Sequence, residues 1–180
     1  MRERVIEIFR SLPPEGIGIH GTNLARAKIM EAEGLKPQKL HPDLPLDDVY
    51  YYVQPPNFNP TYTREHFEQL KEGFLQAYRK YAQRASTWSS YKVDSSPDSS
   101  TPALVIFKPN KVFDQNTLSF THLPFTYIDS DLKPIPALSI YGIIPIHKPT
   151  FPSKLVMSTF ELLRNQGVIN SARLPLPQVR

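Results

Sequence analysis

Apolar residues recur every three or four positions in three stretches of the chain, with charged residues between them. This spacing puts the apolar side chains on one face of a helix, and it predicts helices over 24–33, 63–84 and 155–164. Thr22 or Asn23 can cap the first helix, because the side-chain oxygen of either residue can accept a hydrogen bond from the first turn.

Elsewhere the apolar positions form short runs rich in β-branched and aromatic residues, which are typical of strands. These runs are "GIGIH", "VYYYV", "ALVIF", "TLSFTHLPFTYI" and "ALSIYGIIPI". The first strand is expected to end at His20, where Gly21 turns the chain toward the following helix. Because helices and strands do not alternate regularly, the order predicts an α+β fold with a mixed or antiparallel sheet.

The composition indicates one domain that spans 1–180. Apolar residues make up 40% of the chain and charged residues 21%, which is enough for a core and unlike a disordered chain. Nineteen prolines against seven glycines indicate stiff turns in place of flexible connections. Within this domain we expect a leading helix in 1–15, a mobile Ser/Asp/Pro-rich loop over 86–101 and an extended tail at 171–180.

The charge pattern and the missing cysteines narrow the classes of function. The net charge of +4 is scattered, and no run of Lys and Arg is long enough to mark a nucleic-acid-binding arm. A chain without cysteine has no disulfide, thiolate metal site or Cys nucleophile, and its histidines lack the spacing of a zinc site. No segment matches a signal peptide or a membrane span, so we expect a soluble, cytoplasmic protein without metal, with secretion as an effector left open.

The clearest candidate chemistry lies between the first predicted strand and helix, at His20, Gly21 and Thr22. A neutral imidazole can both donate to and accept from a ribose hydroxyl. A glycine has no Cβ, so its backbone N–H and C=O can come within hydrogen-bond distance of a planar carboxamide. In the next strand, Tyr50 and Tyr52 alternate onto one face and offer a ring for stacking.

A strand that delivers His-Gly-Thr, followed by a helix that ends in Gly34-Leu35, resembles the first catalytic block of the ADP-ribosyltransferase-like superfamily. The run "VYYYVQPP" takes the place of that family's tyrosine strand, and "KYA" at 80–82 ends the long helix much as the family's helix does. The run "PALVIFKP" is similar to the core strand that follows. The resemblance covers 16–145, and its first block is the most specific part.

The resemblance implies a single α+β domain with a split sheet around a cleft for NAD, which is the substrate. It implies that His20 orients the adenosine-side ribose, that Gly21 holds the nicotinamide amide through its backbone, and that Thr22 belongs to the same site. Tyr50 or Tyr52 would stack on the nicotinamide ring, and Tyr50 would act with His20 in catalysis. Such a glycosyltransferase transfers ADP-ribose to a protein or nucleic acid, or hydrolyses NAD, and toxins and effectors of this superfamily are often this size.

The chain departs from this family at the catalytic glutamate. In the family this residue precedes a Gly-x-Ile-Pro turn, which is present at 142–145, so the expected position falls within 137–139. These positions hold Ala, Leu and Ser, and no carboxylate occurs between Asp131 and Glu161. A carboxylate from elsewhere could replace the glutamate, and the candidates are Asp129, Asp131 and Glu72.

Three other interpretations stay open at this point. The missing glutamate favours a catalytically inactive module of the same fold that binds a nucleotide or a protein. An RNA 2′-phosphotransferase-like enzyme needs no such glutamate and holds phosphate with arginines, for which Arg26, Arg64 and Arg79 are available. In an unrelated α+β domain, the His-Gly-Thr segment would be purely structural.

Overall fold

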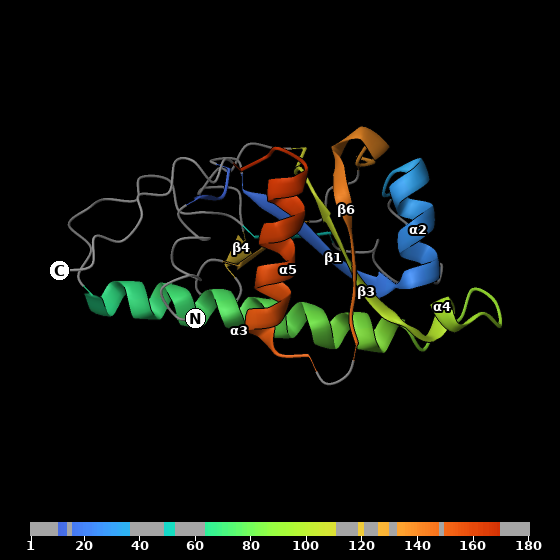
Figure 1. Ribbon diagram of the computed structural model, residues 1–180, viewed down its shortest axis with the longest axis horizontal. Coiled ribbons are helices and arrows are strands. Elements are labelled where there is room, and N and C mark those ends of the chain that lie inside the picture. The colour runs from blue at the N-terminus through green and yellow to red at the C-terminus, as the bar shows by residue number, and fades with distance from the viewer. Residues whose placement is uncertain are drawn as a thin grey trace.

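The structure, a computed structural model, describes residues 11–13, 16–36, 49–52, 64–110, 119–120, 126–129, 133–147 and 150–169 (Figure 1). Its helices are α2 (Leu24–Glu33), α3 (Arg64–Trp88), α4 (Pro97–Ser100) and α5 (Pro152–Asn165). Its strands are β1 (Ile17–Asn23), β2 (Val49–Tyr52), β3 (Pro102–Phe107), β4 (Ser119–Phe120), β5 (Thr126–Asp129) and β6 (Ile140–Pro145), and a 3₁₀ turn, η1 (Ala137–Ser139), precedes β6. Each of the three helices predicted from apolar spacing is present, within a few residues of its expected ends.

The strands form one antiparallel sheet in the order β4-β5-β2-β1-β3-β6. β1 lies inside this sheet and pairs with β2 on one side and with β3 on the other. Helices α3 and α5 pack against one face, and α2 packs against the other face beside β3 and β6 (Figure 1). The predicted α+β class with an antiparallel sheet is therefore confirmed.

Alternation along β1 and β3 divides the core into two layers, because successive side chains of a strand point to opposite faces. The layer under α3 and α5 includes Ile17, Ile19, Leu104 and Ile106. The layer under α2 includes Ala103, Val105 and Phe107. Each residue of β1 can be assigned to a face through its β3 partner, and His20, which pairs with Val105, belongs to the α2 face.

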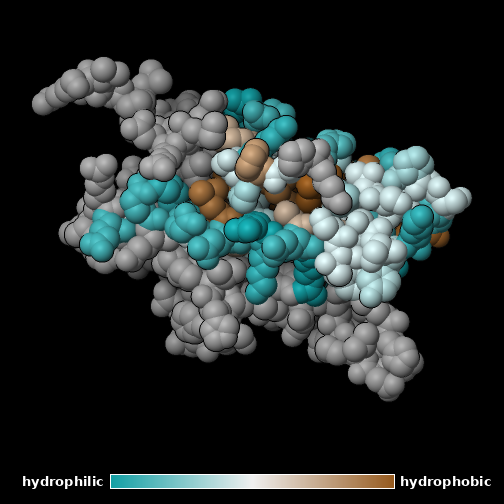
Figure 2. All heavy atoms as spheres, turned by 90° about the horizontal axis from the view of Figure 1, so that it is seen from below, coloured by the Kyte–Doolittle hydropathy of each residue, from teal (hydrophilic) through white to brown (hydrophobic). Residues whose placement is uncertain are grey.

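Helix α3 is amphipathic along its C-terminal half. Its buried side consists of Phe74, Ala77, Tyr78, Tyr81 and Ala85. Its exposed side is polar, and Figure 2 shows hydrophilic side chains gathered along this helix on the face seen from below. The helix begins within one residue of the predicted start at Thr63. It ends at Trp88, four residues past the predicted end at Arg84.

The segment predicted as a mobile loop over 86–101 is more structured than its composition indicates. Ser99, in the segment that follows α3, is buried. Its hydroxyl donates to the Asp94 carboxylate at 2.7 Å and accepts from the Asp94 backbone N–H at 3.1 Å. Hydrogen bonds from Ser96 and Ser99 lower the pKa of Asp94. The one-turn helix α4 follows from Pro97, which suits the first turn because it has no N–H to satisfy. Most of the predicted leading helix and the whole predicted tail lie outside the described residues.

Strand β1 continues through Gly21 to Asn23, so the prediction that Gly21 turns the chain is wrong and His20 lies in mid-strand. Glycine is required there by packing, because a Cβ at position 21 would lie 2.8 Å from the Tyr81 backbone oxygen and 2.9 Å from the Ala85 nitrogen. The chain enters α2 only after Asn23, whose side chain accepts a hydrogen bond from the Arg26 N–H at 2.9 Å.

The Gly-x-Ile-Pro segment, predicted as a turn, lies within β6. The register between β3 and β6 shifts at this point, since Ile106 pairs with Gly142 whereas Phe107 pairs with Ile140. Gly142 has a φ of 151°, which a residue with a side chain rarely adopts. A bulge therefore bends β6 at the start of the segment that was predicted as a turn.

Candidate functional site

His20 is buried, with 3% of its surface exposed, and its Nδ1 atom has no hydrogen-bond partner among the residues that the structure describes. Burial, followed by the positive charges of Arg84 and Arg26, lowers the pKa of His20 from 6.5 to about 4. The imidazole is therefore neutral near physiological pH, as the predicted interaction with a ribose hydroxyl requires.

The unpartnered Nδ1 atom of His20 costs stability. Leaving a buried polar atom without a partner costs about 1–3 kcal/mol, so a purely structural histidine normally has its ring nitrogens hydrogen-bonded. An imidazole kept in this state is suited to a ligand hydroxyl that satisfies it on binding.

Among the described residues, β1 pairs over a shorter length with β2 than with β3. Pairing between β1 and β2 covers three residue pairs and ends at Ile19 and Tyr50, whereas pairing between β1 and β3 covers six and continues to Asn23. Within the described residues, the part of β1 from His20 onward therefore pairs with β3 alone. We call this region, His20–Asn23 on β1 together with the start of β2, the split end.

The backbone N–H and C=O of Gly21 point to the side of β1 on which β2 lies. Leu24 N–H donates to the Thr101 oxygen at 2.8 Å. Leu24 and Thr101, which follow the pair of Asn23 and Pro102 in the register, therefore form a hydrogen-bonded pair. Hydrogen-bonded and non-hydrogen-bonded pairs alternate along an antiparallel ladder, so the N–H and C=O of His20 point toward β3. Those of Gly21 point the other way, toward the side of β2, beyond the last recorded pair with that strand.

The register of β2 relative to β1 is given by three residue pairs. Tyr50 pairs with Ile19, Tyr51 with Gly18 and Tyr52 with Ile17. The stacking role predicted for Tyr50 or Tyr52 depends on this register, because a shift by one residue exchanges the two faces of a strand, and the role stays a prediction.

Thr22 lies on the same face as His20, since it pairs with Ala103, and it is buried with 2% of its surface exposed. Its position within β1 directs its backbone toward β3 and its side chain to the face of His20. The role predicted for Thr22 in the site stays a prediction.

The expected position of the glutamate lies far from the split end in the sheet. Residues 137–139 form η1 next to β6 at the edge of the sheet, and β3 separates β6 from β1. Leu138 at the centre of this turn is fully exposed. A carboxylate for the split end therefore has to come from another element.

Two arginines lie near His20, and the sequence suggested only one of them. Arg26 is in the first turn of α2, and Arg84 precedes the Ala85 that contacts Gly21; both act on the pKa of His20. Arg84 could have been found from the spacing of α3, because it is adjacent to a small residue on the buried side of that helix.

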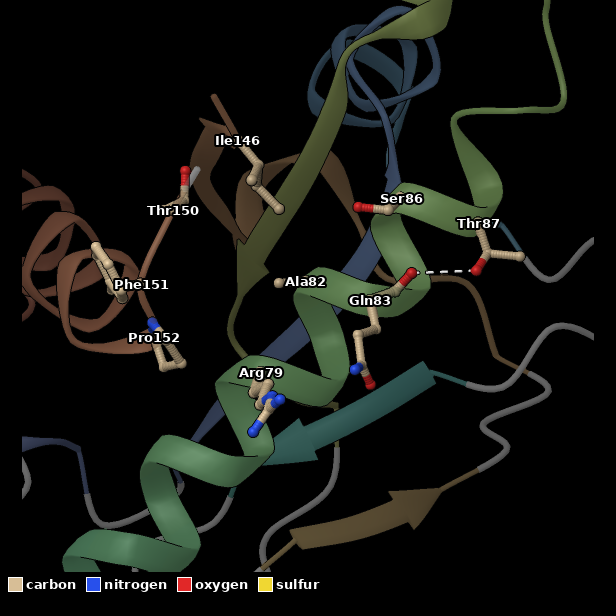
Figure 3. Close-up of a pocket in the computed structure, with 9 residues that line it drawn as sticks. All are labelled: Arg79, Ala82, Gln83, Ser86, Thr87, Ile146, Thr150, Phe151 and Pro152. Atoms are coloured by element: carbon tan, nitrogen blue, oxygen red, sulfur yellow. Dashed lines mark hydrogen bonds between the residues drawn. The ribbon is translucent and has the colours of Figure 1, made fainter. Parts of the chain in front are cut away.

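A separate groove lies on the opposite face of the sheet, between α3 and the start of α5 (Figure 3). It has a volume of about 660 Å³ and is lined by Arg79, Ala82, Gln83, Ser86, Thr87, Ile146, Thr150, Phe151 and Pro152. None of His20, Gly21 and Thr22 is part of this lining. The groove thus provides a control surface for tests of the split end.

Other kinds of site find no support in the part of the chain that the structure describes. It contains no group of three or more His, Cys, Asp or Glu side chains that could hold a metal ion. None of its helices combines the length and apolar content needed to span a bilayer.

Comparisons with known proteins do not place the chain in a family. No protein-family model matches it, and neither a curated protein nor a solved structure is similar to it.

Proposed function

We propose that the chain binds NAD at the split end of β1 and is an ADP-ribosyltransferase-like protein. The observation that carries this proposal is the combination of a backbone edge and an unsatisfied imidazole at adjacent residues. Gly21 directs its N–H and C=O away from β3, and the Nδ1 atom of His20 is buried without a partner.

These groups match the chemistry of the nicotinamide half of NAD. A primary carboxamide has one acceptor oxygen and two donor hydrogens, so one strand residue whose backbone N–H and C=O point to the same side can bind it in two hydrogen bonds. The neutral imidazole of His20 can then accept from, or donate to, a ribose hydroxyl.

The charges around His20 suit the pyrophosphate of NAD. Arg26 and Arg84 are close enough to lower the pKa of His20, so they create a positive potential there. A guanidinium binds phosphate oxygens in a bidentate geometry, and a bound anion would offset part of this potential.

Access is the main cost of binding at this site. Since only 3% of His20 is exposed, NAD reaches the ring only in a conformation in which the split end is open. The measured affinity is then lower than the intrinsic affinity by the fraction of molecules in that conformation.

A catalytically inactive module is the second candidate function, and one observation favours it. The residues at the expected glutamate position form η1, hold no carboxylate and lie at the β6 edge of the sheet. Calorimetry with NAD tests the binding that both candidates share, and release of nicotinamide distinguishes an enzyme from a module.

Replacing Arg26 with Gln is expected to weaken NAD binding about fivefold to tenfold, because one phosphate contact is lost while the neutral amide keeps the length of the side chain. The affinity of the native chain should also fall with added salt, and less steeply in Arg26→Gln. Titration calorimetry at two salt concentrations measures both effects. Arg79→Gln, in the groove between α3 and α5, is the matched control and should bind like the native chain; a loss confined to Arg79→Gln would place the ligand in that groove.

A further inference from the structure

We propose that the groove between α3 and the start of α5 binds a small carboxylate with an aromatic or aliphatic body. The groove lies on the sheet face opposite to His20 and shares no residue with the split end, so binding there does not depend on the proposed function. Its volume of about 660 Å³ is within the range of small-molecule sites, which is roughly 300–1,000 Å³.

Two segments far apart in the sequence form the walls of the groove (Figure 3). One wall is a face of α3, on which Arg79, Gln83 and Ser86 follow one another at intervals of four and three residues, the spacing of one side of a helix. The other wall is the chain that enters α5, where Phe151 and Pro152 lie. Both helices pack on the sheet and on each other, so the fold sets the shape of the groove.

Part of the groove surface is apolar. Ile146, which follows β6, is buried, and Ala82 of α3 is half-buried. Phe151 has 70% of its surface exposed, although removing a phenyl ring from water is favourable. A ligand with an apolar body would cover this ring and contact Ile146 and Ala82.

The charge of the groove favours an anion. Among the described residues that line it, Arg79 carries the one charged side chain, and no described carboxylate forms an ion pair with this arginine. The first turn of α5 contains no acidic residue, and the Phe151 side chain does not cap it with a hydrogen bond. The positive end of the helix dipole therefore adds to the potential of Arg79.

A carboxylate suits this arrangement better than a phosphate monoester. A guanidinium binds the two oxygens of a carboxylate through two parallel hydrogen bonds, which leaves the rest of the ligand free to lie on the apolar surface. A phosphate monoester carries about 1.5 to 2 negative charges at neutral pH, more than one arginine balances. Gln83 and Ser86 can exchange hydrogen bonds with polar groups elsewhere on the ligand.

Titration of the full chain with 4-phenylbutyrate and with its neutral amide, 4-phenylbutanamide, tests the site, with the backbone amide signals followed by NMR. We expect phenylbutyrate to bind with a Kd of about 1–10 mM, to shift signals in 79–87 and 150–155, and to bind about fivefold more tightly than the amide. Arg79→Gln should remove this difference between the two probes. Phe151→Ala should weaken both probes by a similar factor, and Arg164→Gln, at the other end of α5, is the matched control and should bind both like the native chain.

Three results would overturn the assignment. The first is the absence of shifts in these segments at about 20 mM phenylbutyrate, or equal affinity of the native chain for acid and amide. The second is a loss of phenylbutyrate binding in Arg26→Gln, which would place the carboxylate at the split end. The third is binding of acetyl-glutamyl-phenylalanine amide about tenfold more tightly than phenylbutyrate, which would make the occupant a protein segment. Thermal melting checks that each variant is folded, and the comparison of acid with amide on the native chain decides the question if Arg79→Gln is not.

Discussion

Gly21→Ala is expected to destabilise the protein by about 3 kcal/mol or more, which is a large part of the stability of a domain of this size. The added Cβ would lie 2.8 Å from the Tyr81 backbone oxygen and 2.9 Å from the Ala85 nitrogen. Both atoms belong to the backbone of α3, so no side-chain rotation relieves the contact and the helix must move away from β1. Urea unfolding measures the effect as a lower midpoint with an unchanged slope.

Gly167→Ala is the control for this substitution, because Gly167 has a φ of 70° and no atom within 4 Å of the added Cβ. It should cost about 1 kcal/mol from backbone strain alone. Equal losses in the two variants would mean that α3 does not contact β1 as closely at Gly21 as the structure shows.

Acidification from pH 7 to pH 4 is expected to cost about 3 kcal/mol of stability through His20 alone, since its pKa falls from 6.5 to about 4 on folding. Between these two values the unfolded chain binds a proton that the folded chain does not. The stabilising contribution of the neutral ring is therefore complete above about pH 6.5 and is lost as the pH falls toward 4. Chemical unfolding at a series of pH values measures this slope.

His20→Leu isolates that contribution. Leucine fills a similar volume with no polar atom to satisfy, so the variant should lose the part of the pH dependence that lies between pH 6.5 and 4. At neutral pH it should be as stable as the native chain or more stable, because the unpartnered Nδ1 atom is gone. A strongly destabilised His20→Leu at neutral pH would show that the imidazole is a structural group with satisfied contacts.

The elements that depend on local pattern could be predicted from the sequence. The long helix follows from the spacing of Phe74, Tyr78 and Tyr81, and α2 follows from its cap at Asn23. The end of β1 could not be predicted in this way. A glycine at the end of an apolar run usually indicates a turn. Only the structure shows that Gly21 lies in a strand and packs directly against the backbone of α3.

The candidate site depends on pairing between distant segments, which one sequence does not reveal. His20 and Gly21 were singled out from their order along the chain, and both lie in β1. The choice among Tyr50, Tyr51 and Tyr52 depends on the register between β2 and β1. That register is set by contacts between segments about 30 residues apart, which the pattern within either strand does not contain.

The most direct test of the account is titration calorimetry of NAD into the native chain and into His20→Leu. The account predicts that the native chain binds NAD and that His20→Leu, although fully folded, binds it about a hundredfold more weakly, since a buried polar contact is lost. No binding by the native chain, or equal affinity for the two proteins, would contradict the claim that the split end is a dinucleotide site.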